Sequence, residues 1–263
     1  MTSILTNNAA MAALQTLRGV SDSLKDTQGR VSSGYRIDKA ADNAAYWSIA
    51  TTMRSDNKAL GAVSDALGLG AAKVDTAYTA MDSAIDVVGE IKAKIVAATE
   101  NGVDKKKVQE EIDQLQDQLV SIAQSASFSG ENWVAGANGT KSVVSSFVRD
   151  GSNGVSVKMT DYVLDNSSAG NVLFGMSGGQ VETSTGILGT SNGSAGSVYS
   201  LDITSMTIGD LGQALTNVEN ALKAMTSAGA KLGSISTRIN MQDDFVNALS
   251  DSDRKSTRLN SVM

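Results

Sequence analysis

The sequence contains no proline, no cysteine and no histidine among its 263 residues, and aromatic residues make up only 4%. Without cysteine it can form no disulfide and offers no thiol for redox or nucleophilic chemistry. Without histidine it lacks the commonest general base and the commonest metal ligand. A chain of this length that has no proline can form long uninterrupted helices. The composition therefore favours a helical structural protein over an enzyme, and we expect no cofactor.

Charged residues are interspersed along the chain, and 22 basic and 28 acidic residues give a net charge of −6. This distribution argues against a surface for nucleic acid or an anionic membrane. The first residues, MTSILTNNAAMAAL, lack the basic region and apolar run of a secretory signal. No segment approaches 18 consecutive apolar residues. We expect a soluble protein that is not an ordinary secretory substrate and binds neither nucleic acid nor membrane.

Apolar residues recur every seven positions along two long segments, as in helices that bury one face in a coiled coil. The first segment, about 44–99, ends before an Asn-Gly pair typical of a helix C-terminus, and a shorter amphipathic segment follows at about 104–127. The second long segment begins after Thr207, whose spacing to Asp210 resembles a capping box. Three helices are therefore predicted to pack together. The seams contain Leu60, Leu67, Val74, Met81, Val88 and Ile95, and Leu211, Val218, Met225, Leu232, Ile239 and Val246.

Residues 1–33 carry a weaker form of the same pattern, in which Leu17, Leu24 and Val31 are spaced by seven. Ala, Asn and Thr occupy most of the remaining seam. Alone, this segment would bury too little apolar surface to form a stable helix. We therefore expect it to require a partner.

The middle of the chain, between about 130 and 205, is dominated by Gly, Ser, Asn and Thr. SVVSSFVRDGSNGVSVKMT predicts two strands around a DGSNG turn. Short β-branched runs predict further strands at 172–174 and 198–203. The expected fold class is mainly α, with long antiparallel heptad helices forming a rod-like bundle and a small β-rich inserted domain.

Two stretches resemble binding sites but fit structural roles better. GLGAAK at 68–73 resembles a phosphate loop, yet it lies within the heptad run rather than between a strand and a helix. We interpret Gly68 and Gly70 as points where helices approach closely. A cluster of acidic residues at 110–117 is predicted to be a solvated helix face rather than a cation site. It contains Glu110, Glu111, Asp113 and Asp117.

The stretch GRVSSGYRIDKAADNAAYWSIA at 29–50 reads as a joint between two helices. Its Ser-Ser-Gly sequence is expected to end the first helix. Asp38 and Asp42 favour the start of the second helix through capping and the helix dipole. Tyr46 and Trp47 lie in the first turns of that helix, where a packing role is favoured over an aromatic ligand platform.

Three segments closely resemble bacterial flagellin, particularly the forms of soil alphaproteobacteria such as rhizobia: MTSILTNNAAMAALQTL, RVSSGYRIDKAADNAAYWSIA and ALTNVENALKAMTSAGAKLGSISTRINMQDDFV. The resemblance covers about 1–135 and 200–250. It implies a structural subunit that is exported unfolded through the flagellar type III apparatus. An export chaperone and a filament cap are the implied partners, and the product is an extracellular homopolymer for swimming.

Two other functions also fit parts of the sequence. A hook–filament junction protein shares the helical ends, and a surface recognition ligand or adhesin could use the middle domain. An enzymatic middle domain would need a His-Glu-x-x-His zinc motif, which a chain without histidine cannot contain.

The resemblance implies five segments. They are an N-terminal arm helix of the filament's inner core (1–33), the N-terminal part of the rod domain (34–135), a variable outer β-containing domain (136–205), the C-terminal rod helix (206–250) and a tail (251–263). Flagellins end in a C-terminal arm, whereas this chain ends SDSDRKSTRLNSVM without an apolar seam. We expect the tail to be non-native or truncated, and this chain not to build a stable filament as it stands.

Matching family positions supply candidate site residues. The subunit-contact candidates are Arg30, Arg36, Asp42, Arg238 and Asn240. Two further stretches match segments sensed by innate immune receptors: 29–50 by plants and EIKAKIVAAT by animals. The first carries KAADNAAYW where strongly sensed forms differ, and the second has lysines in place of the usual Arg and Leu, so we expect weak recognition. The candidates in these stretches are Gly29, Tyr46, Trp47, Lys92 and Lys94.

Overall fold

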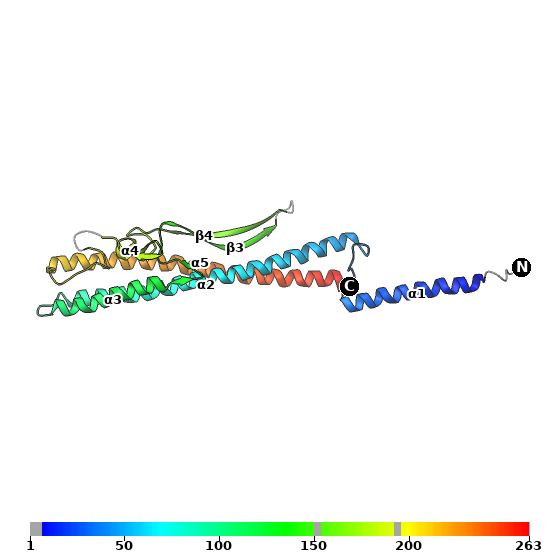
Figure 1. The fold of residues 1–263 in the computed structure, drawn as a ribbon, viewed down its shortest axis with the longest axis horizontal. Helices are drawn as coiled ribbons and strands as arrows, with labels where there is room; N and C mark the ends of the chain where they lie inside the picture. The colour runs from blue at the N-terminus through cyan, green and yellow to red at the C-terminus, as the bar shows by residue number, and fades with distance from the viewer. Residues whose placement is uncertain (1–6, 150–153, 192–195, 263) are drawn as a thin grey trace. The chain divides into compact units, whose positions relative to one another are not determined.

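The computed structural model describes residues 7–149, 154–191 and 196–262 and divides into two compact units. One unit contains residues 1–62 and 247–263, and the other contains residues 63–246. Long helices dominate both units, which confirms the mainly α fold class (Figure 1). The elements are α1 (Asn8–Ser33), α2 (Ala44–Ala97), α3 (Lys105–Ser125), β1 (Ser127–Phe128), β2 (Glu131–Asn132), β3 (Gly139–Arg149), β4 (Val155–Leu164), β5 (Gly175–Ser177), β6 (Gln180–Glu182), α4 (Gly186–Gly189) and α5 (Ile208–Val262).

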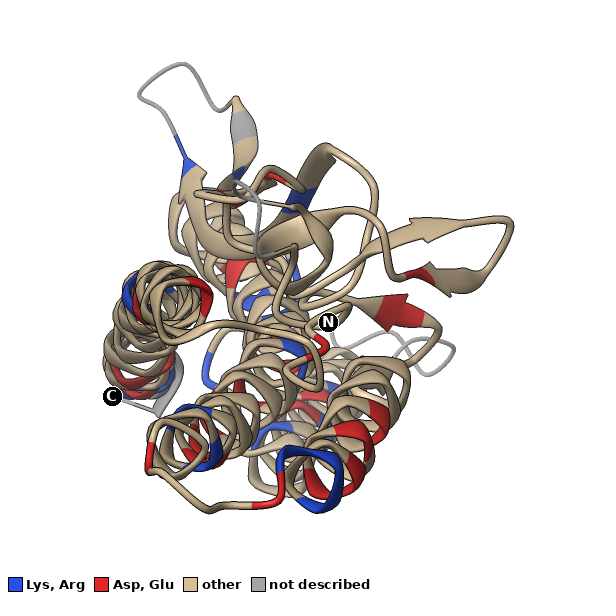
Figure 2. Ribbon diagram, turned by 90° about the vertical axis from the view of Figure 1, so that its left-hand side faces the viewer, with Lys and Arg blue, Asp and Glu red and all other residues tan. Residues whose placement is uncertain are grey.

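In the unit formed by residues 63–246, helices α2, α3 and α5 bury the seams that the seven-residue spacing predicts. Leu67 and Met81 of α2, Leu119 of α3 and Leu232 of α5 have no exposed surface. A turn containing Gly102 in the left-handed conformation (φ 96°) connects α2 to α3. Acidic and basic residues are interspersed over the helices rather than gathered in blocks (Figure 2). None of the described helices has a stretch long and apolar enough to cross a bilayer.

Helix α5 begins at the predicted capping box. The backbone N–H of Thr207 donates to the Asp210 carboxylate at 3.0 Å, and the Asp210 N–H donates to the Thr207 hydroxyl at 3.3 Å. The helix continues to Val262 and so includes residues 251–262; that this tail is non-native or truncated stays a prediction. Within the unit of 1–62 and 247–263, the Asn57 amide donates to the Ser250 hydroxyl at 2.9 Å and joins α2 to this end of α5.

The joint between α1 and α2 has the predicted helix end but a different cap. Gly34 ends α1 in the left-handed conformation (φ 71°), and its N–H donates to the Arg30 carbonyl at 2.8 Å. The Asp42 carboxylate accepts from the N–H groups of Asp38 and Lys39, both at 3.1 Å, so it closes the preceding turn. Asn43 caps α2 instead, accepting from the Tyr46 N–H at 3.2 Å. The prediction that Asp38 and Asp42 cap this helix was wrong, because the Asp42 carboxylate is engaged in the preceding turn and Asp38 lies six residues before the helix begins.

The β-rich insertion contains the predicted hairpin and two smaller ones. β3 pairs antiparallel with β4, with a register shift between Val144 and Ser146. The DGSNG turn lies mostly outside the described residues. β1 pairs with β2 and β5 with β6, also antiparallel. Of the predicted strand at 172–174, only Phe174 pairs, in a single bridge to Ala135.

The segment 198–203 is not a strand, contrary to the prediction. Two buried glutamine side chains of α3 bind its backbone instead. Gln109 accepts from the Ile203 N–H at 2.8 Å and donates to the Leu201 carbonyl at 3.0 Å, while Gln116 donates to the Val198 carbonyl at 3.0 Å. Because these residues are seven apart, they lie on one face of α3 and take the place of a neighbouring strand.

Glycines in the phosphate-loop-like stretch have different surroundings from those predicted. A Cβ at Gly70 would lie 3.1 Å from the Val143 side chain, so the close approach is to strand β3 and not to a helix. Gly68 is exposed, and nothing lies within 4 Å of the position of its Cβ. The interpretation as contacts between helices was therefore wrong for both.

Candidate functional site

Helix α1 presents an apolar stripe that no other described part of the chain covers. No residue of the helix is buried. Leu17, Val20, Leu24 and Val31 are 70%, 62%, 58% and 79% exposed. Their spacing of three, four and seven places them on one face. The arm that the sequence predicted to need a partner is thus a formed helix with its seam open.

Three of the predicted contact residues lie at the end of α1 or in the following joint. Arg30, Arg36 and Asp42 are all exposed. The backbone N–H donors of Lys39 and Asp38, with a smaller contribution from the Arg30 charge, hold the pKa of Asp42 below its usual value. These residues are accessible for binding, and their role as subunit contacts stays a prediction.

A cation–π contact connects this joint to α2 and was not expected from the sequence. The guanidinium of Arg54 lies 5.5 Å from the centre of the Tyr35 ring. The Arg54 Nε also donates to the Ala50 carbonyl at 3.2 Å. No sequence motif pointed to this pair, because it joins the irregular joint to the third turn of the helix that follows.

Arg238 and Asn240, the contact candidates on α5, lie close together on the helix but differ in their interactions. Arg238 donates through Nη2 to the hydroxyl of Thr160 on β4. It therefore holds the β3–β4 hairpin against α5. Asn240 is exposed. Whether either residue also contacts another subunit stays a prediction.

The lysines of the EIKAKIVAAT segment form ion pairs between helices. Lys92 lies 2.5 Å from Glu219 of α5, and Lys94 lies 2.6 Å from Glu111 of α3. The hydrogen bond to Glu111, followed by its charge, raises the pKa of Lys94. Both lysines therefore connect α2 to its neighbours.

The aromatic pair in the other immune-related segment has less packing than predicted. Trp47 is half-buried, while Tyr46 is 45% exposed and so does not anchor the packing. Gly29 lies on α1 and is exposed. The backbone at Gly29 and the side chain of Tyr46 are therefore accessible to an outside partner.

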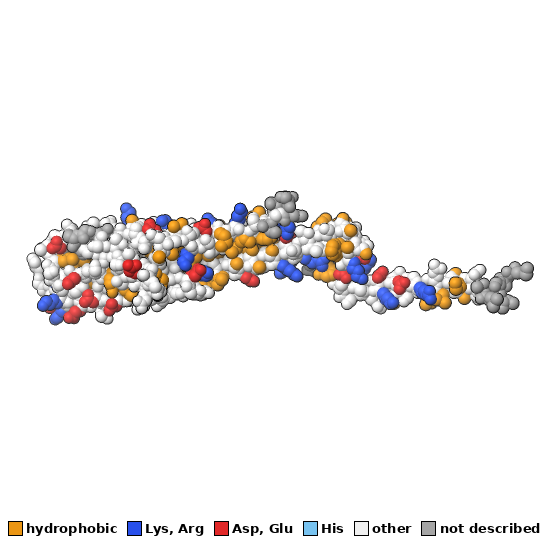
Figure 3. All heavy atoms as spheres, turned by 45° about the horizontal axis from the view of Figure 1, so that its top comes forward, with side chains coloured by type: hydrophobic (Ala, Val, Ile, Leu, Met, Phe, Trp, Pro, Cys, Tyr) orange, Lys and Arg blue, Asp and Glu red, His pale blue; other side chains and the backbone are white. Residues whose placement is uncertain are grey.

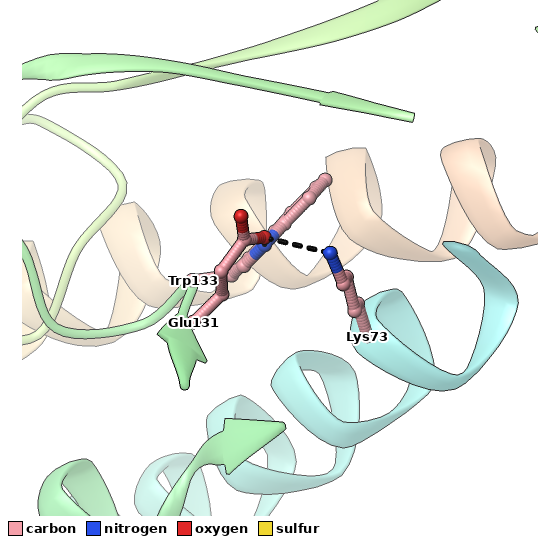
Figure 4. Close-up of polar contacts among 3 residues, drawn as sticks. All are labelled: Lys73, Glu131 and Trp133. Atoms are coloured by element: carbon pink, nitrogen blue, oxygen red, sulfur yellow. Dashed lines mark hydrogen bonds and ion pairs between the residues drawn. The ribbon is translucent and has the colours of Figure 1, made fainter. Parts of the chain in front are cut away.

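The Lys73 side chain belongs to a polar cluster that sequence reasoning missed. The Glu131 carboxylate accepts from Lys73 Nζ at 3.0 Å and from Trp133 Nε1 at 3.3 Å (Figure 4). The hydrogen bond from Lys73, then the one from Trp133, lowers the pKa of Glu131. Trp133 is 1% exposed and stacks on Tyr162 with ring centres 5.7 Å apart. The lysine of the phosphate-loop-like stretch thus fastens the insertion to α2.

The acidic residues of α3 form a solvated face, as predicted. All four are exposed. Glu111 pairs with Lys94, and Asp113 accepts from the Gln109 amide at 2.6 Å. Among the described residues, no group of three or more acidic side chains is placed to hold a metal ion.

Comparison with known proteins gives a consistent result over nearly the whole chain. Residues 4–139 match the family described as the bacterial flagellin N-terminal helical region. Flagellin A of Rhizobium meliloti is 46% identical, with 96% of this chain and 88% of that protein aligned. Flagellin C of Rhizobium meliloti (strain 1021) is 50% identical over 95% of this chain and 84% of its own length. A flagellin of Brucella melitensis biotype 1 is 39% identical over 97% and 83%.

Proposed function

Because the chain belongs to the bacterial flagellin family, we propose that it enters the flagellar filament through the exposed apolar face of α1. The chain is a structural subunit of that filament, and the family implies that it polymerises with other flagellin subunits. The expectation that its tail prevents a stable filament stays a prediction. The alternatives of a junction protein and an adhesin are not favoured, since the relatives are flagellins. The observation that supports the proposed role of α1 is its apolar stripe, which is exposed throughout.

Burial of this stripe supplies a driving force for assembly. Full burial of one Val or Leu side chain stabilises by about 1.5–3 kcal/mol. A lone helix gains none of this, whereas a helix that meets its neighbours in a filament gains it at several positions at once. The arm is therefore expected to gain stability on assembly, as in segments that order on binding.

The charged candidates extend the same contact region. Arg30, Arg36 and Asp42 are exposed at the end of the stripe and in the joint, where they can orient the arm against a neighbouring subunit. On the returning helix α5, Arg238 and Asn240 are proposed to contact a neighbouring subunit in the same way. Charged groups at the rim of an interface mainly set register and specificity.

Export and location follow from the family in this proposal. The subunit passes unfolded through the flagellar export apparatus with a chaperone, is inserted beneath a cap and resides outside the cell. A chain without proline or cysteine suits this passage, because neither prolyl isomerisation nor a disulfide obstructs an extended chain.

Innate immune receptors of plants and animals are proposed as weak partners. A receptor that expects an apolar side chain at position 94 would meet a lysine paired with Glu111. Removing that charge from its partner and from water costs binding energy. A synthetic 29–50 peptide that elicits a plant response equal to that of a strongly sensed flagellin peptide would contradict this expectation.

The role of the arm is tested with a double variant, Leu17→Ser with Leu24→Ser. Both side chains lie on the stripe, so we expect the concentration needed for assembly to rise about 100-fold, measured by sedimentation and electron microscopy. Met11→Ser is the matched control, because Met11 is 68% exposed but lies on another face of α1. Assembly that is insensitive to the double variant, or equally sensitive to the control, would refute the proposal.

A further inference from the structure

Asparagine residues that are followed by glycine are the most reactive asparagines of a protein chain, and this chain has four such pairs. The backbone nitrogen of the glycine attacks the carbon of the asparagine side-chain amide, and glycine has no side chain to hinder the approach. Two of the four pairs, Asn101-Gly102 and Asn138-Gly139, lie wholly within the described residues. The structure therefore allows these two pairs to be compared directly.

The Asn101-Gly102 pair lies in the turn between α2 and α3. Both residues are exposed, and Gly102 adopts the left-handed conformation (φ 96°). No described residue makes a hydrogen bond to the Asn101 side chain or to the Gly102 N–H. Charged side chains gather at the left-hand end of this unit, where α2 turns into α3, so the turn lies in water (Figure 3). The two reacting groups are therefore accessible, and no contact within the described part of the chain holds them apart.

The Asn138-Gly139 pair is also exposed, but hydrogen bonds hold it in place. The Asn138 side-chain oxygen accepts from the Asn166 N–H at 2.8 Å. Gly139 begins β3, where it pairs with Leu164 of β4. Breaking this hydrogen bond and reshaping a paired strand add to the barrier for attack by the glycine nitrogen. Exposure is thus shared by the two pairs, and the surrounding contacts distinguish them.

We propose that Asn101 is a site of spontaneous deamidation in the folded protein. The Gly102 amide nitrogen loses its proton to hydroxide and forms a bond to the Asn101 Cγ, and the side-chain nitrogen takes up a proton and leaves as ammonia. Water then opens the resulting succinimide ring at either of its two carbonyl carbons. One opening yields aspartate, and the other yields isoaspartate, in which the backbone runs through the former side chain. The reaction is a hydrolysis, so it needs no oxidant or reductant.

The reaction changes the turn in both charge and length. Either product places a new carboxylate between α2 and α3, and isoaspartate also adds one carbon atom to the backbone. The Val103 N–H donates to the Glu100 carbonyl at 3.4 Å and so closes the turn around the reactive pair. A longer backbone does not fit this closure, and isoaspartate is therefore expected to loosen the turn. The inference goes beyond the proposed function, because it does not depend on how subunits assemble.

The rates at the two pairs test the proposal. The full chain is incubated at mildly alkaline pH and digested with trypsin, which releases the pairs in separate peptides, 95–105 and 108–141. Mass spectrometry follows the conversion of amide to acid, and fragment masses assign it to a residue. In the folded chain, Asn101 should convert at least about ten times faster than Asn138, because only Asn138 must break native contacts. In guanidinium chloride the two rates should be similar, since both pairs are Asn-Gly.

Equal rates in the folded chain overturn the proposal, and so does a rate difference that persists in the unfolded chain, because that difference would come from the sequence alone. Asn101→Gln is the matched variant. Glutamine keeps an amide at this exposed position but must close a larger ring, which forms more slowly. Peptide 95–105 of this variant should remain unmodified under the same conditions, and conversion as fast as in the parent chain would place the reaction elsewhere in the peptide.

Hydrogen exchange tests the effect on the turn. After the same incubation, exchange of residues 98–108 should accelerate in the parent chain and stay unchanged in Asn101→Gln. Faster exchange in the parent chain alone supports the loosened turn. Complete conversion of Asn101 without faster exchange overturns the loosening of the turn, and acceleration that is equal in the variant shows that the incubation and not the modification causes it, which overturns it as well.

Discussion

Helix α1 and the α2–α3–α5 bundle share one sequence pattern and have opposite surroundings. Leu17 and Leu24 of α1 are seven apart and 70% and 58% exposed. Leu67, Val74 and Met81 of α2 are also seven apart, and none has any exposed surface. The spacing alone therefore determines that a helix has one apolar face. Whether the face is covered depends on a partner, which the bundle finds within the chain and α1 does not find among the described residues.

The largest expected contrast is between buried and exposed leucines. Leu67→Ala should destabilise the bundle by about 2–5 kcal/mol, because it removes buried methyl groups and leaves a cavity. Leu24→Ala on α1 should change the stability of the monomer by less than about 0.5 kcal/mol. Both changes are measured by unfolding in urea, which is monitored by circular dichroism. Equal effects would show that α1 is packed in solution after all.

Two glycine substitutions should have effects of opposite sign. Gly186→Ala is expected to cost about 2–4 kcal/mol, because its φ is 88° and an added Cβ would lie 2.5 Å from the Leu173 carbonyl oxygen. Gly19→Ala lies within α1, where nothing lies within 4 Å of the added Cβ, so it should stabilise the helix by up to about 1 kcal/mol and raise its helix content. Thermal unfolding and far-ultraviolet circular dichroism report the two changes. Destabilisation by Gly19→Ala would indicate a close neighbour at that position.

A matched pair of glutamines tests the polar contacts of the insertion. Gln116→Ala should cost about 1–3 kcal/mol, because it leaves the Val198 carbonyl without its side-chain donor and the Leu201 carbonyl with only the donor from Gln109. Gln15→Ala on the exposed α1 should be nearly neutral. Hydrogen exchange of residues 197–203 should accelerate only in the first variant. Unchanged exchange there would mean that the loop is held by other contacts.

The smallest expected effect depends on pH. The pKa of Glu131 is lowered from its ordinary 4.5, chiefly by Lys73, so its contribution is present above that value and is lost as pH falls through the lowered pKa. Its side chain is 39% exposed, so solvent screening limits the contribution to under about 1 kcal/mol.

Glu131→Gln should remove this acid dependence while Asp22→Asn on α1 serves as the charge-matched control. The emission of Trp133 is measured in a Trp47→Phe background, since the chain has two tryptophans. An acid transition that is the same in Glu131→Gln and in the parent chain would contradict the assignment.

Much of the candidate site could be read from the residues in advance. The apolar face of α1 and the solvated acidic face of α3 both follow from side-chain periodicity, while the need of 1–33 for a partner stays a prediction. The Lys73–Glu131–Trp133 cluster could not be found that way, because it joins residues 58 positions apart. The cap of α2 was misplaced by one residue, since Asp42 and Asn43 are both suitable caps and only the turn geometry distinguishes them.

Local signals were sufficient for the helix ends at Gly34 and Thr207 and for the β3–β4 hairpin, because capping, turn chemistry and periodicity act within a few residues. Contacts between distant parts of the chain decided the conformation of 198–203 and the orientation of the β3–β4 hairpin. Gln109 prevents a strand at 198–203 by binding Leu201, 92 residues away, and the hairpin turns its apolar side outward because its other face is taken by Trp133 and Arg238. Such outcomes depend on which surfaces meet, and that is a property of the folded chain.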